Sequence, residues 1–393
     1  MYKLKKSTWP SFDYKDASKI SQILLSNKVN YWTGEEGKKF EKEFTKFANT
    51  KYAIAVSNGT VALDLALKSL NLKKNDEVIV TPRSFIASVS SVINCGARPV
   101  FADIDINSGN ICLNTISKVL TKKTKAIICV HIAGFPCEMD KIMQFAKKNS
   151  LKVIEDCSQA HGAKIKNKSV GSYGDISAWS FCQEKNITTG GEGGMITTNS
   201  YKLWEKCWSL KDHGKNYKEV FFSKSKGYRW LHHSFGGNYR LTEFQSALGR
   251  IQLKKINTWN KKRKFNSKAI LNELKKYRGL VNIPNIPKDY KHAWYRCCVS
   301  INKCFLKKNW TRDRIIDQLS IRGVGVNIGS CPEIYLEKAF KNKPYKPKKR
   351  LVNAKILGET NIAFLVHPTI SSGELLNIKK IINQVFQKAY NLN

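Results

Sequence analysis

Lys185 stands apart from the other basic residues of this chain by its surroundings. It follows a strand-like run that ends in Ser180-Phe181, and a Gly-Gly-Glu-Gly-Gly turn leads from it into a second strand-like run. A lysine on a loop between two buried strands is partly removed from water, and an amine in that setting can form a Schiff base with a carbonyl. Because most lysines are solvated surface charges, other segments must support this interpretation.

The segment VSNGTVAL at residues 56–63 passes directly from a strand-like run into a helix-like one. Backbone N–H groups at a helix start can bind phosphate, and here Gly59 permits close approach while Thr60 adds a hydroxyl. Asn and Ser are also ordinary helix N-caps, so this segment alone leaves both interpretations open. The chain contains no GxxxxGK[ST] motif, which excludes a Walker-type phosphate site.

The segment KVIEDCSQAHG at 152–162 ends a strand-like run in two acids, Glu155 and Asp156. An Asp at the carboxyl end of a buried strand faces the crevice where cofactors bind, and it can pair with a protonated ring nitrogen there. Capping of the following helix is the alternative for Asp156 and the favoured interpretation for Glu155. His161 follows closely, but no third ligand is spaced to complete a metal site with it.

The turn at 57–60, Asp156 and Lys185 together supply three contacts that pyridoxal phosphate requires. The turn would bind its phosphate, the Asp would keep its pyridine nitrogen protonated, and the Lys would hold its aldehyde. An aromatic side chain should also stack on the pyridine ring. Phe85 in TPRSFIAS, just after the strand-like run DEVIV, is the candidate, and core packing is the alternative for this residue.

Alternating strand-like and helix-like segments must position these residues. The strand candidates lie at 51–56, 76–82, 98–105, 125–134, 152–157, 175–181 and 193–199. Segments with helical spacing of apolar residues, such as 61–72 and 139–149, separate several of them. This alternation predicts an α/β domain with a mostly parallel sheet, in which ligands bind where strands end and turns begin.

The remaining segments predict additional helices and a second domain. Helices are expected at 18–27 and 35–48, and one or two long amphipathic helices at 240–277. Beyond them, a strand-like run at 295–301 mixes with helical segments at 311–323 and 373–390. Because 393 residues exceed what one core usually holds, we expect a large domain at 1–252 and a smaller C-terminal α+β domain at 253–393.

The chain is strongly basic, with 68 Lys and Arg against 30 Asp and Glu, a net charge of +38. Such an excess can mark a protein that binds nucleic acid or a membrane surface. However, the lysines are spread over the chain, and KPYKPKKR at 343–350 is the one concentrated patch. A compositional bias is therefore favoured, with attraction of an acidic small substrate and a polyanionic partner as the alternatives.

Other features indicate a cytoplasmic enzyme without a metal. The basic N-terminus lacks the apolar segment of a signal peptide, and no run approaches the roughly 20 apolar residues of a membrane helix. Eleven cysteines, with no CxxC pair and no Cys/His cluster at zinc spacing, favour reduced thiols over disulfides or a metal site.

The ordered set of motifs resembles the DegT/DnrJ/StrS family of pyridoxal-phosphate-dependent sugar aminotransferases, which have the aspartate-aminotransferase fold type I. The resemblance covers nearly the whole chain and includes SNGTVALDLAL, DEVIVTPRSFIAS, EDCSQAHGA, SFCQEKNITTGGEGGMITTN and GGNYRLTEFQSALGRIQL. It implies a large domain with a mostly parallel mixed sheet and a smaller C-terminal domain. One departure is Cys182-Gln183-Glu184 before the lysine, where many relatives have a His-Pro pair.

The resemblance also implies individual roles. Lys185 matches the Schiff-base lysine, and Asp156 matches the partner of the pyridine nitrogen. Gln159 matches the residue near the phenolic oxygen of the cofactor, and Phe85 matches the stacking aromatic. Asn238 matches the asparagine that reaches the phosphate of the neighbouring subunit, which implies a homodimer with shared active sites.

The phosphate-binding groups implied by the resemblance are Gly59, Thr60 and Ser180. The implied reaction is ping-pong: an amino acid, most often L-glutamate, converts pyridoxal phosphate to pyridoxamine phosphate, which then aminates a nucleotide-linked keto-sugar. Lys185 would move the proton as general base and acid. Some family members carry a histidine in its place and dehydrate or deoxygenate sugars instead. A sugar dehydratase and a non-catalytic, polyanion-binding relative remain the alternatives.

Overall fold

The structure, a computed structural model, describes residues 8–223 and 227–391. A seven-stranded sheet with the order β1-β9-β8-β5-β4-β2-β3 lies at its centre. Its strands are β1 (Tyr52–Val56), β2 (Glu77–Val80), β3 (Arg98–Phe101), β4 (Thr124–Val130), β5 (Lys152–Asp156), β8 (Ile176–Ser180) and β9 (Gly194–Thr198). Within this sheet only the pairings of β9 with β1 and β8 are antiparallel. The predicted mostly parallel sheet is thereby confirmed.

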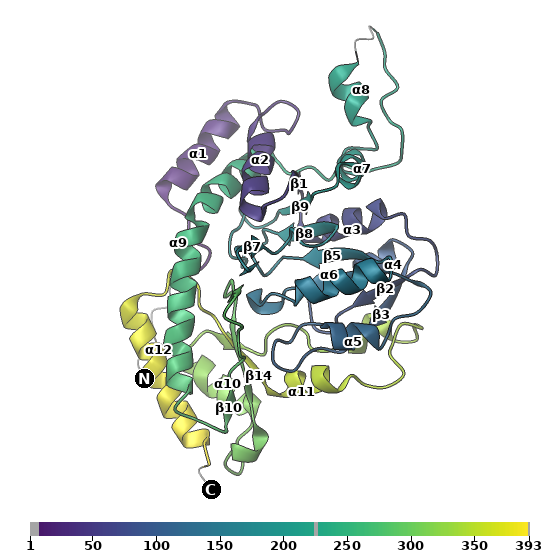
Figure 1. Cartoon of the computed structure of the whole chain (residues 1–393). Coiled ribbons are helices and arrows are strands. Elements are labelled where there is room, and N and C mark those ends of the chain that lie inside the picture. The colour runs from purple at the N-terminus through teal and green to yellow at the C-terminus, as the bar shows by residue number, and fades with distance from the viewer. Residues whose placement is uncertain (1–7, 224–226, 392–393) are drawn as a thin grey trace.

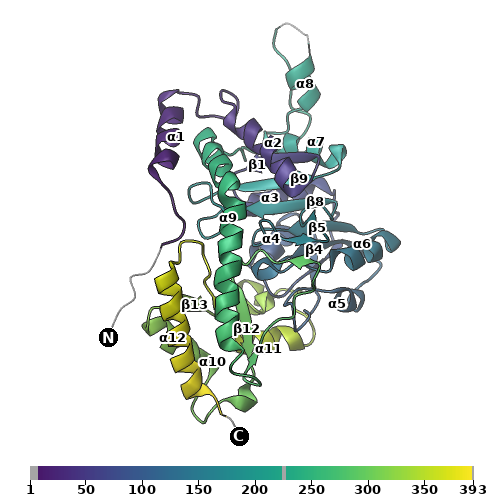
Figure 2. The ribbon, with the colours of Figure 1, turned by 60° about the vertical axis from the view of Figure 1, so that its left-hand side comes forward.

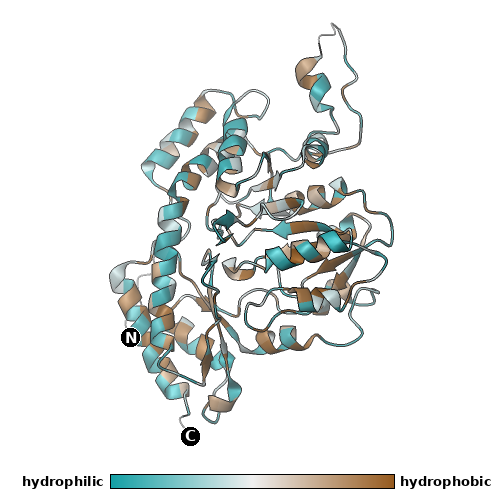
Figure 3. Cartoon of the chain, viewed as in Figure 1, coloured by the Kyte–Doolittle hydropathy of each residue, from teal (hydrophilic) through white to brown (hydrophobic). Residues whose placement is uncertain are grey.

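Helices cover the large sheet on both faces (Figure 1). They are α3 (Gly59–Ser69), α4 (Ala87–Asn94), α5 (Leu113–Ser117), α6 (Met139–Lys148) and α7 (Tyr201–Lys211). Strands such as β2 and β8 have every residue buried, as expected when helices lie over both faces of a sheet. In Figure 3 parts of several strands of the large sheet are brown, whereas α6 shows a teal outer face.

A four-stranded antiparallel sheet of order β10-β12-β14-β13 forms a second, smaller layer. Its strands are β10 (Val281–Asn282), β12 (Cys297–Ile301), β13 (Val326–Asn327) and β14 (Asn361–Phe364). The helices of this region are α10 (Arg312–Ile321) and α12 (Ser372–Ala389), whereas α11 (Val352–Thr360) contributes Ala354 and Leu357 to a core of the large sheet. Ile, Leu and Phe side chains from β12, β14, α10 and α12 form a core separate from that of the large sheet.

The long helix α9 (Glu243–Leu274) connects the two sheet regions (Figure 2). It begins in a capping box formed by Thr242 and Gln245, and it packs against α1 (Tyr14–Leu25), α2 (Glu36–Ala48) and α12. The segment at 240–277 thus forms one helix rather than two. The expected boundary between residues 252 and 253 falls inside this helix, and the division into domains stays a prediction.

A small three-stranded sheet is the one sheet that the sequence analysis did not anticipate. It has the order β11-β6-β7, from β6 (Lys164–Ile165), β7 (Lys168–Ser169) and β11 (Tyr290–Lys291). Two-residue strands carry too little alternation of apolar and polar residues to be recognised. Among the described residues, no helix combines the length and the apolar character required to cross a membrane.

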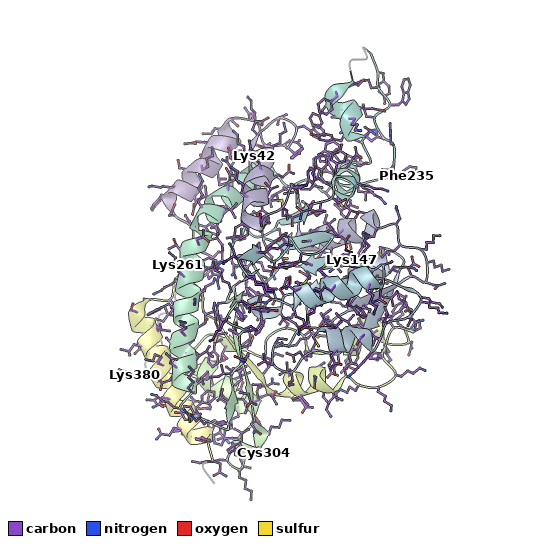
Figure 4. The ribbon with its side chains drawn as sticks, in the orientation of Figure 1. Lys42, Lys147, Phe235, Lys261, Cys304 and Lys380 are labelled. Atoms are coloured by element: carbon purple, nitrogen blue, oxygen red, sulfur yellow. The ribbon has the colours of Figure 1, made fainter. Side chains whose placement is uncertain are left out.

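The helix α8 (Tyr217–Phe222) extends away from the body of the molecule in both views (Figures 1 and 2). We refer to the described residues 217–223 and 227–235 as the arm. Figure 4 labels four lysines, Lys42 on α2, Lys147 on α6, Lys261 on α9 and Lys380 on α12, so lysines occur on helices of both sheet regions.

Candidate active site

Asp156 and Ser180 end two neighbouring parallel strands at the same edge of the large sheet. The register pairs Asp156 of β5 with Ala178 of β8, two residues before Ser180. This edge is the carboxyl end of the parallel strands, where ligands of open α/β sheets bind. The loop that carries Lys185 begins directly after β8.

The turn after β1 brings α3 into contact with the end of β8. The side chain of Asn58 accepts a 2.9 Å hydrogen bond from the backbone N–H of Val61, so Asn58 is the helix N-cap. A Cβ atom at Gly59 would lie 2.6 Å from the Cβ of Ser180, so only glycine allows this approach. Thr60 is exposed at the same helix start. Gly59, Thr60 and Ser180 therefore lie together, although they are far apart in the sequence.

The carboxylate of Asp156 is only 4% exposed and is held by two donors. The Ser88 hydroxyl donates to one oxygen at 2.8 Å, and the backbone N–H of Ser158 donates to the other at 3.1 Å. Both oxygens of the carboxylate are therefore held in position by hydrogen bonds.

Glu155, in contrast, serves the structure. Its oxygens accept hydrogen bonds from the backbone N–H groups of Gly171, Tyr173 and Gly174. It therefore caps a later loop, and the expectation that it caps the helix that follows is wrong. His131 and Cys157 lie close enough to join Glu155 as metal ligands. However, His131 Nδ1 already accepts from the backbone N–H of Cys137 and its Nε2 bonds Glu155, so the polar atoms of this group are used internally.

Lys185 is partly buried, and three contacts hold its loop. Its backbone N–H donates to the carbonyl oxygen of Cys182 at 3.0 Å, and its own carbonyl oxygen accepts from Trp9 Nε1 at 3.0 Å. Its Nζ lies 5.1 Å from the centroid of the Tyr295 ring. The N-terminal segment and the strand region after β11 thus both position a lysine that the large sheet carries.

A cavity of about 300 Å³ brings three of the predicted residues together, namely Phe85, Gln159 and Lys185. Gln159 Oε1 accepts a 2.8 Å hydrogen bond from the backbone N–H of Ala133. Phe85 is 69% exposed, so core packing is excluded for its ring, which is free to stack on a ligand. The structure does not place Asn238 in this cavity; this residue is exposed near the arm.

The cavity is richer in cations than in anions. Its lining includes Arg83, Lys185 and Arg296, with Glu184 as its one carboxylate. Arg296 donates to Glu184 at 2.6 Å and lies over the Tyr295 ring at 4.3 Å. Arg83, Tyr295 and Arg296 were not predicted as site residues from the sequence. Arg83 stood in the quoted segment TPRSFIAS, whereas nothing around Tyr295 and Arg296 indicates a site.

His161 contributes packing rather than acid-base chemistry. It is fully buried against the rings of Trp179 and Phe181. Burial, with the charges of Lys185 and Arg263 nearby, lowers the pKa of His161 to about 3. The ring is therefore neutral at neutral pH.

These observations fit pyridoxal phosphate: a glycine-lined helix start for a phosphate, a buried carboxylate at a strand end, an exposed ring and a loop lysine. The family model for the DegT/DnrJ/EryC1/StrS aminotransferase family matches residues 10–385. The chain belongs to this family. The resemblance inferred from the motifs is thus confirmed over almost the whole chain of this aminotransferase.

Individual relatives agree with the family. The aminotransferase is 34% identical to the GDP-perosamine synthase of Escherichia coli O157:H7, over 96% of this chain and 97% of that protein. It is 53% identical to an aminotransferase structure from Psychrobacter cryohalolentis, with a TM-score of 0.96, covering 97% of this chain and 98% of that one. The E. coli GDP-4-keto-6-deoxy-D-mannose-3-dehydratase, solved with hydrated PLP, is 26% identical with a TM-score of 0.84 and covers 97% and 99%.

Proposed function

We propose that this aminotransferase moves an amino group from an amino acid, L-glutamate by preference, to the ketone of a nucleotide-linked sugar. The observation that carries the proposal is the position of Lys185, which shares one cavity with Phe85 and Gln159. Asp156 does not line this cavity but is linked by hydrogen bonds through Ser88 to Ser84, which does. The name of the GDP-perosamine synthase relative supports a nucleotide sugar as the acceptor.

Pyridoxal phosphate is the cofactor that these residues would hold. When bound, it supplies an aldehyde that receives the amino group and a ring that withdraws electrons from the reacting carbon. The backbone at Gly59 with the hydroxyls of Thr60 and Ser180 would bind its phosphate. The contact between the start of α3 and the end of β8 supports this phosphate site.

The other cofactor contacts follow from the cavity. Asp156 would face the pyridine nitrogen and hold its proton, and hydrogen bonds from Ser88 and Ser158 keep its two oxygens in position. Phe85 would stack on the ring, and Gln159 would lie near the phenolic oxygen. Gln159 is held in place by Ala133.

Lys185 would carry out the proton transfers. Its amine takes the proton from the α-carbon of the amino donor and delivers it to the carbon that receives the amino group. The Tyr295 ring supports this amine from the side of the smaller sheet. The contact of Trp9 with the Lys185 carbonyl oxygen limits movement of the loop during these steps.

We also propose a homodimer in which each subunit completes the site of the other. The arm displays Tyr228, Trp230 and Phe235, which are almost fully exposed, and exposed apolar groups of this kind mark interaction surfaces. Asn238 follows the arm and is exposed. In the dimer it would reach the phosphate in the neighbouring subunit.

The domain division and the location are further proposals. Residues 1–252 would form the cofactor-binding domain and 253–393 the smaller domain. The separate core of the smaller sheet supports this division, while Ile334, Tyr335 and Phe340 pack in the core of the large sheet. We place the reaction in the cytoplasm, supported by eleven cysteines that are all free thiols. The product would enter amino-sugar and polysaccharide biosynthesis.

The test combines a spectrum with a product analysis. Purified protein should show the absorption band of lysine-bound pyridoxal phosphate, lose it with L-glutamate, and regain it with a nucleotide-linked keto-sugar that becomes aminated. A dehydrated or deoxygenated sugar in place of an aminated one would identify a dehydratase instead. Absence of the band after addition of pyridoxal phosphate would reject the aminotransferase function altogether.

A further inference from the structure

Arg83 occupies an unusual position between the two sheet regions. It follows β2, is only 3% exposed, and lines the cavity of Lys185 together with two smaller hollows of about 70 and 30 Å³. Cys298 of β12 and Asn361 of β14 line the larger of these hollows with it, and Cys298 also lines the cavity of Lys185. The Arg83 side chain is thus part of the wall of the active-site cavity.

No described carboxylate lies within ion-pair distance of Arg83. By contrast, Arg240, Arg250 and Arg350 each pair with an acid. Burial lowers the pKa of Arg83, while the neighbouring Cys298 thiol acts in the opposite direction. An arginine nevertheless remains charged at neutral pH, and a buried charge without a partner is costly.

A comparison with Arg263 shows why the cavity matters. Arg263 is also buried and has no acidic partner among the described residues, but it lies over the Trp9 ring at 4.8 Å and lines none of these cavities. Among the described arginines, only Arg83 combines burial, the lack of an acidic partner and a place in the lining of the Lys185 cavity. Among the other cavity groups, Glu184 is already paired with Arg296.

Two glycines set the position of the Arg83 guanidinium. A Cβ at Gly109 would collide with its Nη1, and a Cβ at Gly329 would lie 3.7 Å from its Nη2. Both glycines have positive φ angles, of 72° and 90°, so other residues would be strained there. Backbone therefore surrounds the guanidinium, and no side chain at either position can shield its charge.

We propose that Arg83 binds a carboxylate group of the substrate. The fork of a guanidinium matches the two oxygens of a carboxylate, and this match suits a confined site with small hollows better than a bulky diphosphate does. The inference rests on the proposed function. The carboxylate belongs either to the amino donor or to a sugar acid at the acceptor, and the two sources are separable by experiment.

The experiment compares wild type with Arg83→Gln and Arg83→Lys in each half-reaction. The readout of the donor half-reaction is the loss of the cofactor band with L-glutamate and with L-alanine. The readout of acceptor binding is the recovery of the band with each keto-sugar that the wild type aminates. These sugars include a pair that differs only at C6, where one carries a hydroxymethyl group and the other a carboxylate. Loss of one charge-assisted pair should raise the half-saturating concentration about tenfold to hundredfold in Arg83→Gln.

The pattern of the change identifies the source. If the half-saturating concentrations of both amino acids rise equally, Arg83 binds the α-carboxylate of the donor. If only that of L-glutamate rises, Arg83 binds the glutamate side chain. If only that of the sugar with the C6 carboxylate rises, Arg83 binds the sugar acid. Arg83→Lys keeps the positive charge but lacks the forked guanidinium, so its half-saturating concentration should rise less than that of Arg83→Gln. Unchanged half-saturation in both half-reactions, or a fall in limiting rate alone, would overturn the proposal.

Two controls separate this outcome from other failures. The wild-type spectrum tests the proposed function, since a protein without the cofactor band fails before Arg83 is considered. Thermal unfolding and the cofactor band of each variant report on folding. If Arg83→Gln does not fold, Arg83→Lys and competition by succinate against L-glutamate on the wild type supply the test. A dicarboxylate that does not compete, together with wild-type kinetics in Arg83→Lys, would overturn the proposal.

Discussion

The hydroxyl of Ser88 donates a 2.8 Å hydrogen bond to the carboxylate of Asp156, across 68 positions of sequence. Ser88 in turn lies 2.8 Å from the hydroxyl of Ser84, which lines the active-site cavity. Because Phe85 follows Ser84 directly, this chain of hydroxyls fixes the loop of the stacking ring to the end of β5. The proposed contacts to the ring face and to the ring nitrogen thus depend on each other.

Replacing Asp156 with Asn should remove the charge while keeping most of the shape. We expect the rate of amino transfer to fall about a hundredfold or more, because an amide does not stabilise the protonated ring nitrogen. Ser88→Ala removes only one hydrogen-bond donor to Asp156 and should lower the rate of amino transfer about tenfold. Steady-state rates of the two variants give the comparison, and a Ser88→Ala variant as inactive as Asp156→Asn would contradict it.

Replacing Lys185 with Ala should abolish the lysine-bound cofactor band and lower the turnover about a thousandfold or more. The matched control is Lys147→Ala, because Lys147 is an exposed lysine on α6, away from the cavity. The control should keep the band and the wild-type rate. Retention of the band in Lys185→Ala would show that another amine holds the cofactor.

Gly59→Ala should weaken the binding of pyridoxal phosphate about tenfold. The added Cβ would lie 2.6 Å from the Cβ of Ser180, so α3 must shift away from the strand end. Gly373→Ala is the control, since Gly373 lies in the first turn of α12 and a Cβ there meets nothing within 4 Å. Equilibrium titration with the cofactor measures both. Equal affinities in the two variants would argue against a phosphate site at Gly59.

His161→Phe should make the protein less sensitive to acid. In the folded wild type the pKa of His161 is about 3, whereas the unfolded value is about 6.5. The unfolded state therefore binds more protons as the pH falls below 6.5, and this site removes about 2 kcal/mol of stability between pH 7 and pH 5. Urea unfolding at both pH values measures the free energy of unfolding, which should decrease less between pH 7 and pH 5 in the variant than in the wild type. Identical losses would mean that His161 titrates normally.

Changing the exposed aromatic residues of the arm should weaken the proposed dimer. We expect Trp230→Ser combined with Phe235→Ser to lower the apparent mass in sedimentation and to reduce activity at low protein concentration, because the arm loses apolar contact area. Ile321→Ser, at an exposed apolar residue on α10, is the control and should leave the mass unchanged. A double variant that sediments like the wild type would place the dimer interface elsewhere.

The order and type of the main elements were predictable because their signals are local. The runs at 152–157 and 175–181 are apolar and bounded by polar residues, and they form β5 and β8 as expected. Helical spacing likewise predicted α9, although not that it would be continuous. The two-residue strands β6, β7, β10, β11 and β13 were not predicted, because two residues are too few to show an alternation of apolar and polar side chains, and the four-residue strand β14 was not predicted either.

The amino-acid sequence by itself determined which residues stand at the ends of strands, and therefore that Asp156 and Lys185 would lie at one edge of a sheet. The ends of strands are set by local runs of apolar residues bounded by polar ones. When such strands pair in parallel, their carboxyl ends meet at the same edge of the sheet. Only the tertiary structure decided what surrounds them. The contacts of Trp9 with Lys185 and of Arg83 with the β12 and β14 region join distant segments. Such contacts arise from the packing of two separate cores, and no local pattern records them.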